Sequence, residues 1–278
     1  MKLAVIIPAA GGSARFNFGS DIPRSKLDED LGGKPVIQRS IELFNKLDEV
    51  CAIIVAGPAD PAAFEQFKAR HGDRFELLGV TLCAGGKDHR YQTVREALKL
   101  VPADSTHIAV HDAARPCTPV ELVERMIEAA QRYRAVVPGI EVLDTLKRAR
   151  EMDRLKDDVD PLARILGDDG ASASASRRAT IRVAAETVDR SSLFAVQTPQ
   201  IFEAGLLRRA YEQQDLTSTD DAGVVERLLA SEHALEPRVV VVPGDSRNIK
   251  ITHLADVSMA RLILGFSSPR EKPAHLRF

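Results

Sequence analysis

A run of small residues that ends in an arginine is the first feature of the sequence that could do chemistry. The segment reads Pro8-Ala9-Ala10-Gly11-Gly12-Ser13-Ala14-Arg15. Small side chains let the backbone approach a ligand closely, and consecutive N–H groups in such a turn form a concavity that binds anions. The planar guanidinium of Arg15 suits phosphate oxygens. The run indicates either a phosphate-binding loop or a plain strand-to-helix turn, and it matches neither the Walker loop nor the dinucleotide fingerprint.

Two charged residues further along have side chains that phosphate chemistry uses. Lys26 stands in a polar stretch, and in a phosphate site it would neutralise charge on a transferring phosphorus, although a lone surface lysine is usually just solvated. Asp112 lies within His111-Asp112-Ala113-Ala114-Arg115-Pro116, which follows an apolar run. A carboxylate there could hold magnesium or cap a helix. His111 fits a packed residue at the end of a strand better than it fits a catalyst.

Three later clusters combine hydrogen-bonding side chains with turn signals. Taken singly, each fits a structural role better than a functional one, since Thr219 or Asp220 would make an ordinary helix cap. The clusters are Gln197-Thr198-Pro199-Gln200, Ser218-Thr219-Asp220-Asp221-Ala222 and Asn248-Ile249-Lys250-Ile251-Thr252.

Short apolar runs that alternate with amphipathic segments must position these residues. The alternation predicts an α/β fold, Rossmann-like, with a mostly parallel sheet and helices on both faces. Ligands of such sheets bind beyond the carboxyl ends of the strands, so the small-residue loop and Asp112 should face each other there. The predicted strands are residues 2–8, 51–56, 80–83, 106–111 and 135–138, and the predicted helices are 35–47, 60–71, 91–100 and 119–133, the last entered through Thr118 as its cap.

The regular pattern breaks after the fifth predicted strand. Residues 141–188 are rich in charged and small polar types, and 168–176 (DDGASASAS) are of low complexity. Helical signals return at 203–213, 220–230 and 253–264, and residues 238–242 predict a strand. We therefore expect one domain over residues 1–266, a protruding β-arm with an insertion at 141–190, and a flexible tail at 267–278.

Composition excludes several classes of protein. The chain has 278 residues and a formal net charge of −2, so it carries no overall basic field suited to nucleic acid. It contains no run of 18 apolar residues, and its N-terminus lacks the features of a signal peptide. Three widely spaced cysteines (Cys51, Cys83 and Cys117) predict reduced thiols in a cytoplasmic protein, and not a disulfide framework or a zinc site.

Taken together and in order, eight stretches of the chain resemble the 2-C-methyl-D-erythritol 4-phosphate cytidylyltransferase family of the non-mevalonate isoprenoid pathway. The resemblance implies an enzyme that joins CTP to the sugar-alcohol phosphate, uses magnesium and releases pyrophosphate. It also implies a homodimer in which the β-arm of one subunit reaches over the active site of the other. The stretches are PAAGGSARF, KLDEDLGGKP, HDAARP, DTLKR, TVDR, QTPQ, TDDA and NIKIT, and they run from residue 8 to residue 252.

The same resemblance assigns roles to individual residues. Arg15, Lys26 and Lys250 would be catalytic, and Asp112 would ligate magnesium. The acceptor phosphate is already an anion, so no general base is required and catalysis rests on positioning and charge neutralisation. Nucleotide contacts are expected from Ala9, Ala10, Gly11, Gly12, Ser13, Gly86, Asp88, Thr93 and Ala113, and acceptor contacts from Arg115, Thr145, Arg190 and Thr219, with Arg115 and Thr145 serving the neighbouring subunit.

The chain departs from the family pattern in two regions. The family usually has proline directly before the catalytic lysine, whereas this chain has Ile22-Pro23-Arg24-Ser25-Lys26, with a longer loop and with Ser13 in place of a glycine. We choose Lys26 over Arg24 because Lys26 keeps the family's distance to Gly32-Gly33. Residues 147–187 form a long insertion, which is either a tolerated surface loop or a lid or partner-docking segment.

The sequence is also compatible with three other functions. A cytidylyltransferase for a pentitol phosphate, such as ribitol 5-phosphate, would share the same triphosphate machinery and differ in the acceptor pocket. A sugar nucleotidyltransferase that uses UTP or another base would differ in contacts to the base. A non-catalytic nucleotide-binding regulator is disfavoured, because the expected charges at Arg15, Lys26, Asp112, Arg190 and Lys250 are all present.

Overall fold

The computed structural model describes residues 1–19, 24–153, 180–232 and 238–266, which form two compact units. The first unit comprises Met1–Ile140 and Val196–Phe278, and the second comprises Glu141–Ala195. The low-complexity stretch at 168–176 and the predicted tail at 267–278 lie outside the described residues.

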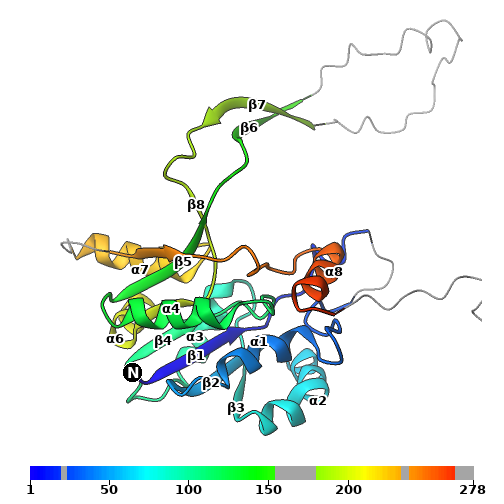
Figure 1. Cartoon of the computed structure of the whole chain (residues 1–278), viewed down its shortest axis with the longest axis vertical. Coiled ribbons are helices and arrows are strands. Elements are labelled where there is room, and N and C mark those ends of the chain that lie inside the picture. The colour runs from blue at the N-terminus through cyan, green and yellow to red at the C-terminus, as the bar shows by residue number, and fades with distance from the viewer. Residues whose placement is uncertain (20–23, 154–179, 233–237, 267–278) are drawn as a thin grey trace, which may run out of the picture. The chain divides into compact units, whose positions relative to one another are not determined.

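A largely parallel sheet forms the centre of the first unit (Figure 1). Its strands lie in the order β10-β5-β9-β4-β1-β2-β3, and β8 also pairs with β5. The strands are β1 (Leu3–Pro8), β2 (Val50–Gly57), β3 (Val80–Ala84), β4 (His107–Val110), β5 (Ala135–Glu141), β8 (Phe194–Val196), β9 (Gln200–Glu203) and β10 (Val240–Pro243). The predicted fold class is therefore confirmed.

Strand β1 shows why the sheet is buried on both faces. Leu3 and Ile7 belong to one hydrophobic cluster, and Ala4 and Ile6 belong to another. Alternate side chains of a strand point to opposite faces, so an unbroken apolar run such as LAVIIP requires a covering layer on each side. Helices α1 (Val36–Phe44), α2 (Pro61–Leu77), α4 (Val120–Ala130) and α8 (Leu254–Ile263) contribute to the first cluster, and α3 (Arg90–Leu98), α6 (Ala204–Ala210) and α7 (Asp221–Ser231) contribute to the second.

Of β8 and β9, the two strands of the sheet that the sequence did not predict, β9 lies in the interior of the sheet. It runs antiparallel between β4 and β5, with Ile201 opposite Ala109 on one side and Val136 on the other. The residues QIFE are too few to show a period, yet Ile201 and Phe202 are fully buried. This strand carries the QTPQ cluster to the carboxyl end of β4.

The two predicted helix caps had different outcomes. Asp220 caps α7, because its carboxylate accepts a hydrogen bond from the backbone N–H of Gly223 at 3.1 Å. The prediction for Thr118 was wrong, since Pro119 is the residue before α4 and makes no side-chain cap. The Thr118 hydroxyl instead donates to the carbonyl of Arg115 (3.0 Å) or to the side chain of Asn248 (2.8 Å). Both partners belong to clusters that the sequence singled out as candidate site residues.

The second unit is a two-stranded antiparallel sheet, which agrees with the predicted β-arm. Strand β6 (Leu146–Asp153) pairs with β7 (Thr180–Val188), and an irregularity falls between Arg148 and Ala149. The Arg148 and Glu186 side chains form an exposed ion pair across the strands at 2.5 Å. A two-stranded sheet alone is marginally stable in water, so further contacts are needed to stabilise it.

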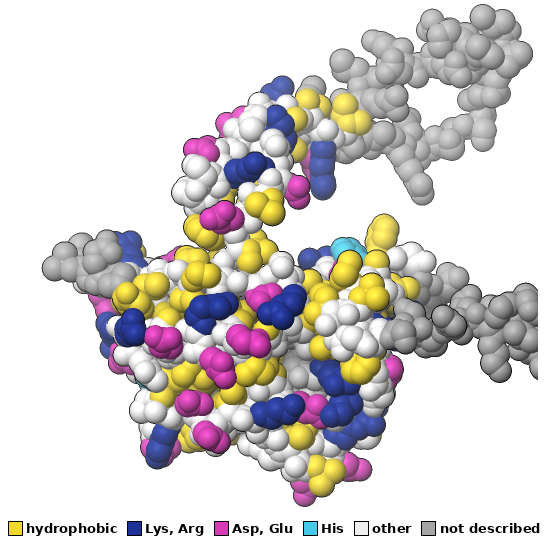
Figure 2. All heavy atoms as spheres, viewed as in Figure 1, with side chains coloured by type: hydrophobic (Ala, Val, Ile, Leu, Met, Phe, Trp, Pro, Cys, Tyr) yellow, Lys and Arg dark blue, Asp and Glu magenta, His cyan; other side chains and the backbone are white. Residues whose placement is uncertain are grey.

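The structure also bears on the predictions about membrane spans, thiols and surface charge. Within the described ranges, no helix is both long enough and apolar enough to cross a membrane. All three cysteines carry free thiols, and burial raises the pKa of Cys83 to about 11 and that of Cys117 to about 12. On the face of the molecule shown in Figure 2, acidic and basic side chains are interspersed, in keeping with the small net charge.

Replacement of Phe44 by alanine should destabilise the first unit severely. The Phe44 ring is fully buried at the end of α1, and it lies edge-on to the ring of His111 at 5.0 Å between centroids. Loss of a buried phenylalanine costs about 3–5 kcal/mol through lost transfer free energy and the remaining cavity. Urea unfolding should show this loss for Phe44→Ala. Leu77→Ala, at a side chain that is 87% exposed, should change the free energy of unfolding by less than about 0.5 kcal/mol.

Candidate active site

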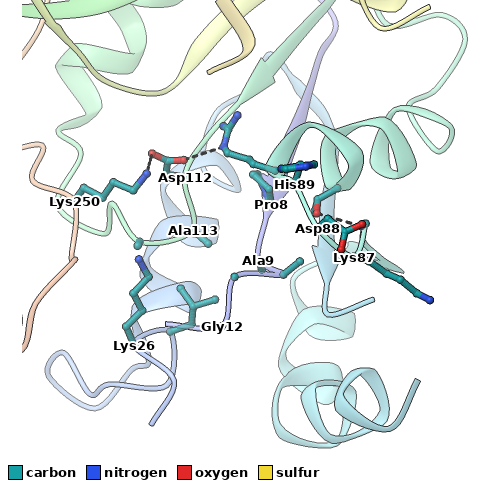
Figure 3. Close-up of a pocket in the computed structure, with 17 residues that line it drawn as sticks. Pro8, Ala9, Gly12, Lys26, Lys87, Asp88, His89, Asp112, Ala113 and Lys250 are labelled. Carbon is teal, nitrogen blue, oxygen red and sulfur yellow. Dashed lines mark hydrogen bonds and ion pairs between the residues drawn. The ribbon is translucent and has the colours of Figure 1, made fainter. Parts of the chain in front are cut away.

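A pocket of about 300 Å³ lies at the carboxyl ends of the parallel strands (Figure 3). Its walls come from the loop after β1, the loop between β3 and α3, and the loop after β4, with two lysines from elsewhere in the chain. This is the edge at which open α/β sheets bind ligands. The structure brings together eleven of the residues predicted from the sequence: Ala9, Ala10, Gly11, Gly12, Lys26, Gly86, Asp88, Thr93, Asp112, Ala113 and Lys250.

The loop after β1 is built for close approach of a ligand. The N–H of Ala9 donates to the carbonyl of Ala56 at 2.7 Å and fixes where the loop begins. Gly11 and Gly12 are exposed and have open space where a side chain would stand. Ser13 has a φ of +55°, a conformation that favours glycine, and its hydroxyl accepts a hydrogen bond from the backbone N–H of Lys26 at 3.3 Å. The serine thus ties the loop to the lysine.

Lys26 lines the pocket, and its surroundings lower its pKa. Its Nζ donates to the carbonyl of Ile251 at 2.9 Å. Burial, together with the positive charges of Lys250 and Arg15, outweighs the attraction of Asp112 and lowers the pKa of Lys26 to about 8. Arg24, the other cation considered for this position, is exposed and pairs with Glu29 at 3.5 Å. Of these two cations, Lys26 is the one that lines the pocket.

Asp112 is a single carboxylate surrounded by three cations. Lys250 Nζ lies 2.8 Å from Oδ2, Arg115 Nε lies 3.4 Å from Oδ2, and Arg90 Nε lies 3.5 Å from Oδ1. Burial would raise the pKa of this carboxyl, but Arg90, Lys250 and Arg115 outweigh burial and hold the pKa well below its usual range. Asp112 is therefore ionised at neutral pH, and the site keeps an excess of positive charge that suits an anion.

The clusters at 197–200 and 248–252 form the scaffold beneath Asp112. The buried side chain of Asn248 donates to the carbonyl of Thr198 at 2.9 Å, and the Asn248 carbonyl accepts from Arg115 Nη1 at 2.7 Å. The Thr198 hydroxyl in turn accepts from the backbone N–H of Asp112 at 3.0 Å. These bonds hold Lys250, two residues after Asn248, beside the carboxylate.

His111 is packed into the core, as its position at the end of β4 indicated. Its side chain is fully buried, and burial lowers its pKa to about 4, so the ring is neutral at physiological pH. Nε2 lies 3.3 Å from the carbonyl of Arg115, and the ring contacts Phe44. His111 is not among the residues that line the pocket.

The loop before α3 forms the opposite wall. The N–H of Gly86 donates to the Thr93 hydroxyl at 3.1 Å, and the N–H of Asp88 donates to Gln92 Oε1 at 3.0 Å. A Cβ on Gly86 would lie 2.2 Å from the Cβ of Gln92, so the turn requires glycine. Lys87, Asp88 and His89 all line the pocket, and Figure 3 shows the Lys87 side chain extending away from the other labelled side chains.

The remaining predicted residues do not line the pocket. Arg15 is exposed, Thr219 is exposed beside the Asp220 cap, and the Arg115 guanidinium is buried and bonded within its own chain. In the second unit, Thr145 is exposed and Arg190 Nη1 donates to the carbonyl of Leu143. The binding roles expected for these five residues, and for Ser13, remain predictions.

Arg90 is the member of the ion-pair cluster around Asp112 that sequence reasoning missed. It lines the pocket and pairs with both Asp112 and Asp221. Its signal was its place in Gly85-Gly86-Lys87-Asp88-His89-Arg90, after a strand at the ligand-binding edge, but a single arginine there could equally have faced solvent. The sequence also did not assign Pro8, Leu27, Lys87, His89 and Ala114, which complete the lining.

The fold and the site define a nucleotidyltransferase of the α/β class, and the comparisons with known proteins specify the family. The sequence profile of 2-C-methyl-D-erythritol 4-phosphate cytidylyltransferase matches residues 3–161 and 171–266. Enzymes of that name from Geobacillus kaustophilus and Bacteroides thetaiotaomicron are 32% and 34% identical; each alignment covers 95% of this chain, and 97% and 100% of the relatives. This chain belongs to the 2-C-methyl-D-erythritol 4-phosphate cytidylyltransferase family.

Solved structures of the same family share the fold. A 4-diphosphocytidyl-2C-methyl-D-erythritol synthase is similar with a TM-score of 0.65 and 28% identity, over 95% of this chain and 99% of that chain. The 2-C-methyl-D-erythritol 4-phosphate cytidylyltransferase from Thermus thermophilus has a TM-score of 0.63 and 28% identity, over 95% and 98%.

Anion binding at this site should weaken as the pH rises through the pKa of Lys26. The lysine is charged below about pH 8 and neutral above it, so it attracts an anion only on the acid side. The affinity for inorganic tripolyphosphate, measured by calorimetric titration without metal, should therefore be compared between wild type and Lys26→Arg, in which the charge persists. The affinity of wild type divided by that of the variant should fall between pH 7 and pH 9.5. Protonation of the probe cancels in this ratio, and a flat ratio would contradict the assignment.

Proposed function

We propose that this chain transfers CMP from CTP to 2-C-methyl-D-erythritol 4-phosphate and releases pyrophosphate. The observation that carries the proposal is the pocket itself, where Lys26, Arg90 and Lys250 gather around Asp112 beside a loop of small residues. Such a site suits a polyanionic nucleotide. Membership of the family supplies the base and the acceptor.

In this reaction an oxygen of the acceptor phosphate attacks the α-phosphorus of CTP, and the bond from that phosphorus to the bridging oxygen of the β-phosphate breaks. The acceptor needs no general base because its phosphate is already ionised, and the buried His111 stays neutral away from the pocket lining. The residues of the chain act by position and charge. Lys26 and Lys250 are placed to neutralise the negative charge that the transition state spreads over the phosphate oxygens.

A magnesium ion fits this arrangement, with Asp112 as its protein ligand. Among the described residues no group of three or more His, Cys, Asp or Glu side chains could hold a metal ion alone. Magnesium commonly binds through one or two carboxylates together with substrate phosphates and water, and Asp112 is an ionised carboxylate in the pocket wall. When bound, the ion would neutralise charge on the phosphates.

The active unit in this proposal is a homodimer. The arm strands β6 and β7 leave their side chains largely exposed, and a two-stranded sheet needs further contacts for stability. The sequence assigned Thr145 and Arg115 to the neighbouring subunit, but Arg115 belongs to the first unit, whereas Thr145 and Arg190 belong to the second. An arm that reaches the partner subunit would therefore deliver Thr145 and Arg190 to the acceptor phosphate in the partner's site.

Turnover with two acceptors tests the assignment directly. Pyrophosphate release should require CTP, magnesium and 2-C-methyl-D-erythritol 4-phosphate, and it should be absent with ribitol 5-phosphate. Lys26→Ala should lower kcat/KM by about 10²–10³-fold, because it removes a charge aimed at the transition state. Arg24→Ala is the matched control and should stay within about twofold of wild type.

Each alternative has its own result in this assay. Turnover with ribitol 5-phosphate alone would assign the protein to the pentitol phosphates. No pyrophosphate release with either acceptor, in a folded protein that still binds CTP, would indicate a non-catalytic regulator.

Mixing two inactive variants tests the shared site. Lys26→Ala disables the pocket, and Arg190→Ala disables the arm. If each site combines one subunit's pocket with the other's arm, a refolded equimolar mixture should recover about a quarter of wild-type activity, since half of the dimers then contain one intact site. No recovery, in a mixture shown by mass spectrometry to contain heterodimers, would mean that each subunit completes its own site.

A further inference from the structure

A buried carboxylate outside the pocket holds one of the cations of the site. Asp221, the first residue of α7, is fully buried. Its Oδ2 accepts from Arg90 Nη1 at 2.6 Å, and its Oδ1 accepts from the Tyr211 hydroxyl at 2.5 Å. A buried charge is costly unless it is paired and hydrogen-bonded, and here both oxygens have a donor. Asp221 is therefore a well-determined anchor.

Arg90 connects this anchor to the reactive side of the pocket. Its Nη1 lies 2.6 Å from Asp221, and its Nε lies 3.5 Å from Oδ1 of Asp112. Burial would lower the pKa of the guanidinium, but Asp221 and Asp112 outweigh burial and raise it, so Arg90 stays charged. The shorter contact shows that Asp221, and not Asp112, fixes the position of the arginine.

Lys250 contrasts with Arg90 in how firmly it is held. It contacts the other oxygen of Asp112 at 2.8 Å, its side chain is 37% exposed, and within the described chain its ion pair is with Asp112. A flexible lysine held by one carboxylate can turn toward the phosphates of a nucleotide. Arg90 cannot follow it, because movement would leave Asp221 buried without its counter-ion.

We propose that Asp221 is a positioning residue, which holds Arg90 as a fixed cation so that Asp112 keeps its orientation when Lys250 leaves it for the triphosphate. The proposal rests on the proposed cytidylyl transfer and adds to it a residue outside the pocket. Tyr211 supports the anchor by fixing the second oxygen of Asp221. Asp221 thus affects the reaction through Arg90 and not by contact with substrate.

Asp221→Asn separates this role from simple structural damage. The substitution keeps the shape of the side chain and frees Arg90, so the pocket gains net positive charge. Oδ1 of Asp112 then loses its fixed neighbour, whereas Arg115 remains beside Oδ2. We expect kcat to fall by about 10–100-fold. The Kd for CTP, measured by calorimetry without metal at low salt, should be unchanged or tighter. A kcat within about twofold of wild type, or a Kd that weakens together with kcat, would overturn the proposal.

A double-mutant cycle tests whether Asp221 acts through Arg90. Arg90→Gln alone should lower kcat and weaken CTP binding, because it removes a cation from the pocket. Adding Asp221→Asn to this variant should lower kcat no further, since the anchored group is already gone. Two losses that multiply would show that Asp221 works independently of Arg90, and would refute the proposal.

The neighbouring carboxylate provides the matched control. Asp220 caps the same helix, and its carboxylate accepts from the backbone N–H of Gly223 and from Gln200 Nε2, whereas no described contact joins it to Arg90. Asp220→Asn should lower the melting temperature and leave kcat unchanged. A loss of kcat equal to that of Asp221→Asn would mean that the effect comes from the helix end and not from the anchor.

Tyr211→Phe, which removes only the hydroxyl, replaces Asp221→Asn if that variant does not fold. It should lower kcat by about two- to tenfold, and an unchanged kcat would count against the anchor.

A spectroscopic measurement distinguishes failure of this proposal from failure of the proposed function. Absence of turnover in the wild type would refute the function alone. The side-chain Nη1–H signal of Arg90 in ¹H–¹⁵N spectra reports on the group that donates to Asp221, and it needs neither ligand nor activity. It should exchange slowly with water in wild type and in Lys250→Gln, and rapidly in Asp221→Asn. An unchanged signal in Asp221→Asn would refute the anchoring whatever the enzyme does.

Discussion

The site depends on one carboxylate that is outnumbered by cations. Asp112 is ionised in a largely buried place because Lys250, Arg115 and Arg90 surround it. Asp112, together with Asp221 beside Arg90, in turn offsets the repulsion among those cations. Mutual neutralisation of this kind lets a protein assemble a strongly positive pocket before any ligand is present.

The three cations around Asp112 are held in different ways, and this division organises the rest of the site. Arg115 is fixed to the backbone of Asn248, Arg90 is fixed to a buried carboxylate, and Lys250 is held by Asp112 alone among its described ion pairs. Rigid groups preserve geometry, whereas a displaceable group can transfer its charge to a ligand. Lys26 adds a fourth cation whose proton is weakly held because it is buried among the others.

Much of the fold and most of the pocket could be predicted from the sequence, for reasons that individual residues illustrate. The unbroken apolar run of β1 is typical of a parallel strand that is covered on both faces. The loop of small residues that follows it indicates a turn that a ligand can approach closely. Strand β9 could not be predicted, because four residues show no period and because Ile201 pairs with Val136 and Ala109, which lie 65 and 92 residues earlier. Arg90 and the Thr118 hydroxyl were misjudged for a related reason: their partners, Asp221 and Asn248, are distant in sequence.

The central position of β9 also has a consequence for the order of assembly during synthesis. When the first 140 residues have left the ribosome, β3, β2, β1 and β4 can pair with one another, but β5 has no neighbour because β9 separates it from β4. The nascent sheet therefore presents an open hydrogen-bonding edge at β4 until residue 203 emerges. The residues that close this edge follow directly on Thr198, whose hydroxyl supports Asp112, so closure of the β4 edge and placement of that support are one step, which precedes the arrival of β10 and Lys250.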